Sequence, residues 1–397
     1  MKVAGLFAGI GGIELGFKRA LGDAVETELL CEWWEPAQRV LGTRFAGVEV
    51  HPDVRRLRDL PEALDVLAAG FPCTDLSQAG RTAGIRGEQS GLVAHVFEML
   101  RQRARNGLKL PTLVIENVPN MLTLDRGEAM RYLVGEIEEL GYEWAYRVVD
   151  SRFTGTPQRR RRVLLVASVD LDPCSVLFAD NATERPVTDF AQDAFGFYWT
   201  EGRGGLGWAQ DAVPTLKGGS TIGIASPPAV WLPSADIGRA IVVPSVADGE
   251  ALQGFPRGWT DVEMEFAPAR RLGTRWKLVG NAVTVDVASW LARRLASPGE
   301  VACESESLVG TRWPNAAAGR SGDVRRVFAS EFPVHNPYRH LLDVVDAGSA
   351  QPLSARAVAG FHSRLLRGKL GQHPGFREAI AAYDQLVNPA LLAASSM

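Results

Sequence analysis

The chain has 397 residues, of which 46% are hydrophobic and 22% charged, and its formal net charge is −3. This length predicts a large domain with a smaller partner, and no apolar run approaches the roughly 20 residues that a membrane helix needs. The near-neutral charge balance by itself favours neither a nucleic-acid partner nor a small-molecule substrate.

The first 170 residues alternate short apolar runs with helical patterns. Strands are predicted at residues 3–7, 27–32, 64–70, 112–118 and 161–168, and helices at residues 13–21 and 91–104. Strands that are apolar on both faces and alternate with helices predict an α/β domain with a mostly parallel, doubly wound sheet. Ligands of such a sheet bind at the carboxyl ends of the strands.

Glycine, proline, serine and threonine then dominate, and they predict a smaller, loop-rich domain. A helical pattern returns near Val279, and a linker-like break at residues 297–299 precedes the tail. In that tail Ser354 is a predicted N-cap for a helix whose Val358 and Phe361 fall at helical spacing. We therefore divide the chain into residues 1–170, 171–256, 257–298 and 299–397, the last of unknown role.

The cysteines are widely separated and include no C-x-x-C pair. They are Cys31, Cys73, Cys174 and Cys303. This spacing argues against a disulfide framework and against a zinc knuckle, so we expect no metal site and a reducing cytoplasm. The apolar N-terminus carries too many glycines for a signal peptide, and we predict no targeting signal.

A glycine-rich segment, FAGIGG at residues 7–12, follows the first predicted strand. Its glycines let the backbone approach an adenosyl ligand, although a tight strand-to-helix turn needs the same residues. The absence of G-x-G-x-x-G spacing disfavours a nicotinamide-dependent oxidoreductase. Glu32 and Trp33 end the next strand, where a carboxylate can accept from ribose hydroxyls and an indole can pack on adenine. A solvated acid and a core tryptophan are their ordinary alternatives, and Asp53 has a turn or cap role as its alternative.

Cys73 lies in GFPCTDLSQAG, directly after a predicted strand and before a polar loop. Its sulfur is expected at the carboxyl end of that strand, which suits a nucleophile. An isolated cysteine is more often a small buried hydrophobe. The polar neighbours Thr74, Asp75 and Ser77 indicate an exposed setting instead.

Glu116 closes an apolar strand, where a carboxylate needs a partner or a water-filled cleft. Capping of the next segment is the ordinary alternative. Arg160 and Arg162 precede another strand and share one face of an extended segment. Between residues 147 and 162 six arginines stand against one acid, a patch suited either to solvent or to a phosphate backbone.

Seven blocks in this order resemble the DNA (cytosine-5) methyltransferase family over about residues 3–296. They are FAGIGG, the Glu32–Trp33 pair, GFPCTDLSQAG, ENV, QRRRR, LQGFP and GNAVT. The resemblance implies the fold of methyltransferases that use S-adenosylmethionine, with a smaller target-recognition domain. It also implies double-stranded DNA as the partner.

The resemblance also implies roles for individual residues. Cofactor contacts fall to Phe7, Gly9, Gly12, Glu32, Trp33, Asp53, Asn281 and Ala282. Catalytic roles fall to Cys73 as the nucleophile, Glu116 at N3 of the base, Arg162 at O2, and Arg160 as a second arginine beside the cleft. Target recognition falls to Thr215, Leu216, Gly218 and Gly219, and Gln253 belongs to the block that scaffolds the recognition domain. Within the same recognition segment, Lys217 and the nearby Arg203 can touch phosphates or guanines, and a surface-loop role is their ordinary alternative.

Two segments depart from the family pattern. Thr74 follows the cysteine where the family often has glutamine, which changes contacts in the loop but leaves the nucleophile in place. The segment before LQGFP is acidic in this chain, SVADGEA, where the family usually has an arginine-rich stretch. The packing role of that segment therefore stays open.

The predicted function is methyl transfer from S-adenosylmethionine to carbon 5 of cytosine in a specific duplex sequence. Thiolate addition at carbon 6 activates carbon 5, and the base must be flipped out of the helix to be reached. A transfer-RNA cytosine-5 methyltransferase is the first alternative, disfavoured by the separate recognition segment. A catalytically silent DNA-binding regulator is the second, disfavoured by the joint presence of Cys73, Glu116 and Arg162. We expect a monomer in the cytoplasm, at the nucleoid; the target sequence and a companion restriction endonuclease are left open.

Overall fold

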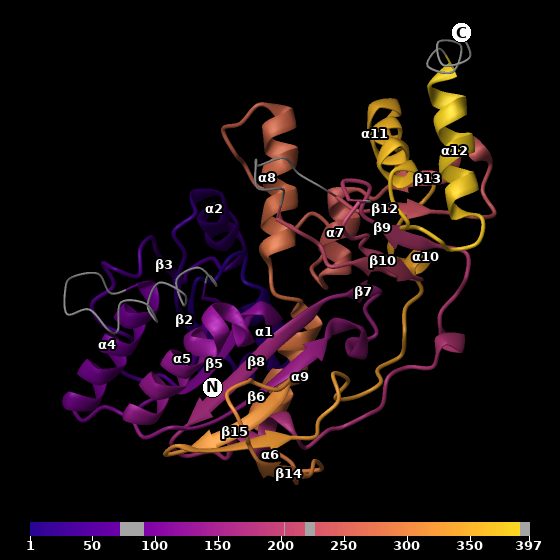
Figure 1. The fold of residues 1–397 in the computed structure, drawn as a ribbon. Coiled ribbons are helices and arrows are strands. Elements are labelled where there is room, and N and C mark those ends of the chain that lie inside the picture. Colours follow the sequence, from indigo (N-terminus) through magenta and orange to yellow (C-terminus); the bar gives the residue numbers. More distant parts are fainter. Residues whose placement is uncertain (72–90, 202, 219–226, 390–397) are drawn as a thin grey trace. The chain divides into compact units, whose positions relative to one another are not determined.

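The computed structural model describes residues 1–71, 91–201, 203–218 and 227–389 (Figure 1). The chain divides into two compact units. The first comprises Met1–Thr154, Arg161–Glu184 and Ala282–Asn336, and the second comprises Gly155–Arg160, Arg185–Asn281 and Pro337–Met397. Each unit is therefore assembled from three separate stretches of chain.

The first unit is built on a sheet with ten strands among the described residues. Its parallel strands are β1 (Lys2–Leu6), β2 (Glu26–Cys31), β3 (Glu49–His51), β4 (Val66–Ala69) and β5 (Thr112–Asn117). They lie in the order β3-β2-β1-β4-β5. The strand order changes direction between β1 and β4, and ligands of open α/β sheets bind at the carboxyl ends of strands at such a point.

The other half of this sheet is antiparallel. Its strands are β6 (Glu143–Asp150), β8 (Arg161–Ser168), β14 (Ser305–Ser307), β15 (Ala316–Arg320) and β16 (Asp323–Val327). They continue beyond β5 in the order β8-β6-β15-β16-β14. The predicted α/β architecture is confirmed, with its parallel part confined to five strands. β8 runs antiparallel because residues 151–160 are too few for the crossover that a parallel connection needs.

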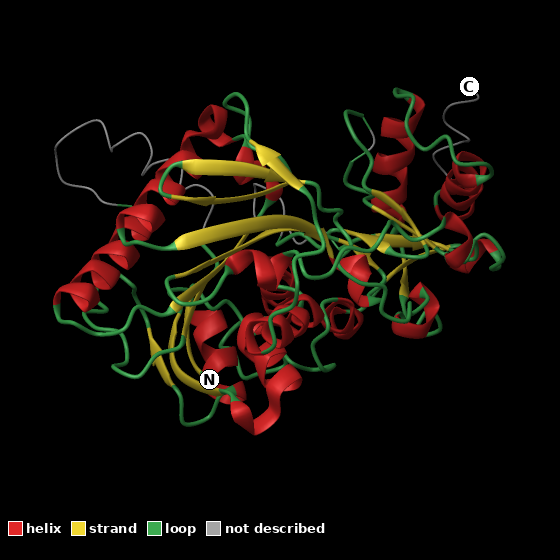
Figure 2. Cartoon of the chain, turned by 90° about the horizontal axis from the view of Figure 1, so that it is seen from below, coloured by secondary structure: helices red, strands yellow, loops and turns green. Residues whose placement is uncertain are grey.

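Helices cover both faces of the first sheet (Figure 2). α4 (Leu92–Arg105) and α5 (Glu128–Glu139) pack on the face that carries Leu6. α1 (Gly12–Leu21), α6 (Pro173–Leu177) and α9 (Val285–Ala296) pack on the face that carries Val3. A further helix, α2 (Glu35–Arg44), connects β2 to β3. Both faces of the strands are therefore buried, as the continuous apolar runs predict.

The helices α1 and α9 approach each other closely. A Cβ atom built on Gly16 would lie 2.5 Å from the Cβ of Ala288 and 2.6 Å from the carbonyl oxygen of Val285. The hydroxyl of Ser289 also donates to the carbonyl of Gly16 at 2.9 Å. The helical pattern that the sequence predicts from Val279 is confirmed from Val285 onward as α9, whereas Val279 itself belongs to α8. The helix α9 is held against α1 through a backbone-to-backbone contact.

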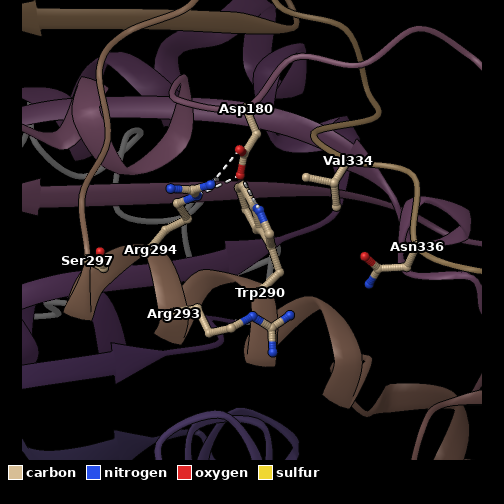
Figure 3. A pocket seen from close by; sticks show the side chains of 7 residues that line it. All are labelled: Asp180, Trp290, Arg293, Arg294, Ser297, Val334 and Asn336. Atoms are coloured by element: carbon tan, nitrogen blue, oxygen red, sulfur yellow. Dashed lines mark hydrogen bonds and ion pairs between the residues drawn. The ribbon is translucent and has the colours of Figure 1, made fainter.

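Arg147 anchors a loop of the first unit from inside the core. The side chain is fully buried and donates to the carbonyl oxygens of Leu177 and Asp180 at 2.8 and 2.6 Å. The carboxylate of Asp180 in turn accepts from Arg294 at 2.6 and 2.5 Å and from Trp290 at 3.0 Å, beside a pocket of about 270 Å³ (Figure 3). The two roles that the sequence suggests for the arginine patch, solvent exposure or phosphate binding, are both wrong for Arg147, because this buried side chain binds carbonyls of its own unit.

The second unit is built on a small antiparallel sheet. Its strands are β10 (Trp208–Gln210), β9 (Phe195–Phe197), β12 (Ala229–Trp231), β13 (Ile241–Val243) and β17 (Gln351–Pro352), in that order. A separate parallel pair joins β7 (Gln158–Arg159) to β11 (Val213–Pro214). The segment predicted to be loop-rich therefore contains several strands of two or three residues.

The helices of the second unit come from two parts of the chain. They are α7 (Val246–Leu252), α8 (Pro268–Asn281), α10 (Leu341–Val344), α11 (Ala355–Leu366) and α12 (Phe376–Val387). Ser354 caps α11 by accepting from the backbone N–H of Ala357 at 3.4 Å, as predicted, and Phe361 is buried.

The compact units do not follow the boundaries drawn from the sequence. The tail after residue 298 divides between them, because β14–β16 extend the first sheet whereas β17 pairs with β13. Residues 257–281 belong to the second unit and not to the first.

Candidate active site

The candidate site lies in the first unit, where its parallel strands end. The glycine-rich loop at residues 7–12 follows β1, Glu32 and Trp33 follow β2, and Asp53 follows β3. Glu116 is the second-to-last residue of β5. Because β1 to β5 are parallel, these residues share one edge of the sheet.

The loop after β1 needs glycine for its backbone. Phe7, Gly9 and Gly11 have φ angles of 56°, 58° and 81°, in the left-handed region that favours glycine. A Cβ atom built on Gly9 would meet nothing within 4 Å, so the backbone there borders open space. Gly12 begins α1, and the loop therefore leads into a helix N-terminus, whose first backbone N–H groups have no partner within the helical ladder.

Glu32 ties this loop to the end of β2. Its two carboxylate oxygens accept from the backbone N–H groups of Gly9 and Trp34, each at 2.8 Å. Burial raises the pKa of Glu32, and these hydrogen bonds oppose that shift. Trp33 is 74% exposed, which leaves an indole face beside the loop.

Asp53 forms an ion pair with a neighbour. Its carboxylate oxygens accept from Arg55 at 2.9 and 2.8 Å, and these hydrogen bonds hold the pKa of Asp53 below its usual value. The carboxylate is therefore fixed in place near the end of β3.

Glu116 and Arg162 are brought together by the pairing of β5 with β8. Glu116 lies opposite Leu164 in this antiparallel ladder, so Arg162 falls two residues away on the neighbouring strand. The Nε atom of Arg162 lies 2.8 Å from Oε1 of Glu116, and both side chains are largely buried. The structure thus places a carboxylate and a guanidinium side by side at the end of a buried strand.

Asn117 is a residue whose role the sequence did not suggest. Its side-chain amide donates to the carbonyl oxygen of Phe71 at 2.9 Å, and its Oδ1 accepts from the N–H of Val118 at 2.8 Å. Phe71 also packs against Phe7, with ring centroids 5.4 Å apart. Asn117 therefore links the end of β5 to the segment that follows β4. A polar residue directly after a strand acid was the available signal.

Cys73 lies outside the described residues, and Phe71 is the last described residue before it. Burial raises the pKa of both Cys31 and Cys174 to about 12. A thiol with such a pKa stays protonated near neutral pH and is a poor nucleophile. Burial also raises the pKa of Cys303.

Arg160 is buried in the second unit, at the end of β7. Its guanidinium donates to the carbonyl oxygens of Leu216 and Gly280, at 3.0 and 3.4 Å. Nearby, the side chain of Gln158 donates to Gln253 at 3.0 Å and accepts from the N–H of Leu216 at 3.1 Å. These contacts join β7 to the segment after β11, and they make Arg160, like Arg147, unavailable to phosphates at the surface.

The residues predicted to recognise DNA lie along that segment. The hydroxyl of Thr215 donates to the carbonyl of Arg159 at 2.7 Å, and Leu216 is buried. A Cβ atom on Gly218 would lie 2.0 Å from Oδ1 of Asn281, so the Asn281 amide packs on the Gly218 backbone. Gly219 lies outside the described residues. Ala282 is buried and belongs to the first unit.

The acidic segment before LQGFP packs inside the second unit. Asp248 and Glu250 are fully buried and pair with Arg257 at 2.7 Å and Arg275 at 3.2 Å. These arginines satisfy the acids from later in the sequence, which gives the segment a packing role.

Among the residues that the structure describes, no cluster of His, Cys, Asp and Glu side chains is arranged to hold a metal ion. No helix there is long and apolar enough to cross a membrane.

Comparison with known proteins places the chain in a family. Residues 1–189 match the model of the C-5 cytosine-specific DNA methylases. The chain is also 44% identical over 373 residues to the Type II methyltransferase M2.BsuMI of Bacillus subtilis (strain 168), covering 92% of this chain and 94% of that protein. The chain belongs to the C-5 cytosine-specific DNA methylase family. It is a DNA (cytosine-5) methyltransferase, and the family implies S-adenosylmethionine as the methyl donor.

Other relatives match a shorter part of this chain. The Type II methyltransferase M.BsuFI of Bacillus subtilis is 35% identical over 164 residues, which are 41% of this chain and 37% of that protein. The structure of the Schizosaccharomyces pombe enzyme titled "S. pombe Dnmt2 methyltransferase" has a TM-score of 0.54 at 14% identity, covering 75% of this chain and 98% of that one. This likeness confirms the methyltransferase fold.

Proposed function

We propose that the protein methylates carbon 5 of cytosine in a specific double-stranded DNA sequence, through a covalent adduct between Cys73 and a flipped base. The observation that carries this proposal is the pair of Glu116 and Arg162, 2.8 Å apart at the carboxyl end of β5. Cytosine presents an acceptor at O2, and beside it an edge formed by N3 and the amino group. A guanidinium and a carboxylate side by side match that edge.

In the proposed reaction the thiolate of Cys73 adds to carbon 6 of cytosine, and the ring gains electron density at carbon 5. Glu116 holds the base at N3 and at its amino group, while Arg162 stabilises the charge at O2. After methyl transfer, loss of the proton from carbon 5 expels the thiolate and restores the ring. Flipping the base into the site costs a few kcal/mol of stacking and pairing energy.

The residues around the glycine-rich loop fit S-adenosylmethionine, which supplies the methyl group when bound. The open space at Gly9 accommodates a ligand against the backbone, and the exposed indole of Trp33 offers a face for adenine. The carboxylate of Glu32 can accept from ribose hydroxyls in addition to its two backbone donors. Phe7, Gly12, Asp53, Asn281 and Ala282 complete the proposed set of contacts.

We further propose that the segment from Thr215 to Gly219 meets the DNA. Support comes from the buried side chains of Gln158 and Arg160, which hold the backbone N–H and carbonyl of Leu216 through hydrogen bonds. In this proposal Arg160 positions the recognition segment. The role beside the catalytic cleft, which the family resemblance implies, is its second proposed role.

The proposal is tested by methyl transfer from labelled S-adenosylmethionine to duplex DNA of random sequence, with the product mapped by bisulfite sequencing. The purified protein should produce 5-methylcytosine within one short sequence. Cys73→Ala should abolish the product. Glu116→Gln should lower turnover by about 10²- to 10⁴-fold, the usual contribution of a proton-transfer group, with DNA affinity kept within a few-fold.

The matched control is Glu26→Gln, at an exposed acid of β2 whose side chain is 70% accessible. It should leave turnover unchanged. Transfer RNA serves as a competing substrate in the same assay. Methylation of transfer RNA in preference to duplex DNA, or full turnover by Glu116→Gln, would contradict the proposal.

A further inference from the structure

Lys217 lies on the surface of the second unit, beside Tyr198 and Glu201, and we call these three side chains the cage. The ammonium group of Lys217 stands 4.3 Å from the ring centroid of Tyr198 and makes an ion pair with the carboxylate of Glu201. The side chains of Lys217 and Glu201 are 47% and 28% exposed, so both remain accessible to a ligand. The cage thus presents a donor and an acceptor next to each other.

The backbone on which Lys217 stands is fixed by neighbours on both sides. The hydroxyl of Tyr198 donates to the carbonyl of Thr215 at 2.6 Å, and the N–H of Leu216 donates to Gln158 at 3.1 Å. A Cβ atom built on Gly280 would lie 2.2 Å from the carbonyl carbon of Lys217, so the end of α8 packs directly on this backbone. The Lys217 side chain therefore starts from a fixed point.

Glu201 is fixed just as firmly. One carboxylate oxygen accepts from the N–H of Gly207 at 2.7 Å, while the other faces Lys217. The backbone carbonyl of Glu201 accepts from Arg364 of α11 at 3.0 Å. The pair is thus preorganised by contacts from the C-terminal tail as well as from its own loop.

The chemistry of this cage is wrong for a phosphate. A carboxylate in contact with the lysine repels the negative phosphate and already neutralises the ammonium. By contrast, Arg203 is exposed in the same loop and has no ion-pair or hydrogen-bond partner among the described residues. Arg203 has the features of a phosphate contact, whereas the Lys217–Glu201 pair has those of a group that reads base edges.

We propose, on the basis of the function proposed above, that Lys217 and Glu201 together read one G·C base pair in the major groove. Guanine presents two acceptors there, N7 and O6, and its partner cytosine presents an amino donor. The ammonium group of Lys217 has three N–H donors, of which one serves Glu201 and two are left for guanine. Glu201 retains acceptor capacity for the cytosine amino group. The lysine donors then face the guanine acceptors, and the glutamate acceptor faces the amino donor of cytosine.

The test compares methylation rates of the full-length wild type and variants on a library in which each position of the target sequence is varied. Lys217→Met and Glu201→Ala should each lower discrimination at the same single G·C pair, on the order of ten- to a hundredfold, the worth of a good bidentate base contact. Lys217→Arg should keep the preference for guanine, because arginine also donates to O6 and N7.

Arg203→Ala is the matched control. It should weaken binding to all sequences by one common factor and lower the slope of log affinity against log salt by about one. If Lys217→Met behaves in that way instead, Lys217 contacts a phosphate and the proposal is overturned. Unchanged discrimination in both Lys217→Met and Glu201→Ala would overturn it as well. A wild type that methylates no DNA would count against the proposed function and not against this base-reading pair alone.

Discussion

The Glu116–Arg162 pair depends on both partners because the two side chains are largely buried. Removing one partner of a buried ion pair typically costs 3–5 kcal/mol, since the other charge is left without compensation. Replacement of Arg162 therefore combines a loss of stability with any loss of catalysis. Glu116→Gln is the cleaner probe, because the amide keeps the shape and a hydrogen-bonding oxygen.

Glu14 carries a buried carboxyl group outside the proposed chemistry. It is 2% exposed, in the first turn of α1, and a Cβ atom on Gly5 would lie 1.9 Å from its Oε1. The missing side chain at Gly5 thus makes the room for this group. Burial raises the pKa of Glu14 from 4.5 to about 7, and a backbone hydrogen bond to the carboxyl group opposes that shift.

This pKa predicts a loss of stability as the pH rises. Between pH 4.5 and 7 the unfolded chain releases the Glu14 proton while the folded protein keeps it, so the free energy of unfolding falls with pH, by at most about 1.4 kcal/mol per pH unit in the middle of this range. Glu14→Gln should remove this slope. Urea unfolding at pH 5, 6 and 7 measures the free energy for both proteins, and parallel pH profiles for the two would contradict the prediction.

Two helical glycines, Gly16 and Gly42, differ in the space that a side chain would find. Gly16 of α1 faces α9 with no room for a side chain, whereas a Cβ atom on the exposed Gly42 of α2 would meet nothing within 4 Å. Gly16→Ala should therefore destabilise the protein by about 1–3 kcal/mol through overpacking. Gly42→Ala should stabilise it by about 0.5–1 kcal/mol, because alanine loses less backbone entropy. Thermal unfolding of the two variants would refute this if both shifted the midpoint in the same direction.

Elements with a clear apolar period were predictable, and those with buried polar residues were not. The runs that form β1, β4, β5 and β8 stand out as apolar, and Ser354 marks the start of α11. β6 did not stand out, because its sequence EWAYRVVD contains Arg147 and Asp150. Both are buried, and Arg147 is satisfied by carbonyls some 30 residues away, a compensation that no local pattern reveals.

In the whole molecule, the sequence predicted which residues lie at the ends of the strands better than it predicted the boundaries of the two units. The residues at the ends of β1, β2 and β5 were predictable, because parallel strands bring their carboxyl ends to one edge. The strand β3 before Asp53 was not predicted. The division of the tail was not, since it depends on two strand pairings with distant partners, β15 with β6 and β17 with β13. The position of Arg160 was not predictable either, because its carbonyl partners Leu216 and Gly280 lie far along the chain.

The proposed methylation of cytosine depends on a covalent bond between Cys73 and the target base. The most direct test is incubation with S-adenosylmethionine and duplex DNA that carries 5-fluorocytosine at the target position, since fluorine cannot leave carbon 5 as a proton does. We expect a protein–DNA adduct that survives denaturing electrophoresis, is lost in Cys73→Ala, and maps to the peptide that contains Cys73. An adduct that persists in Cys73→Ala, or an active enzyme that forms no adduct, would contradict it.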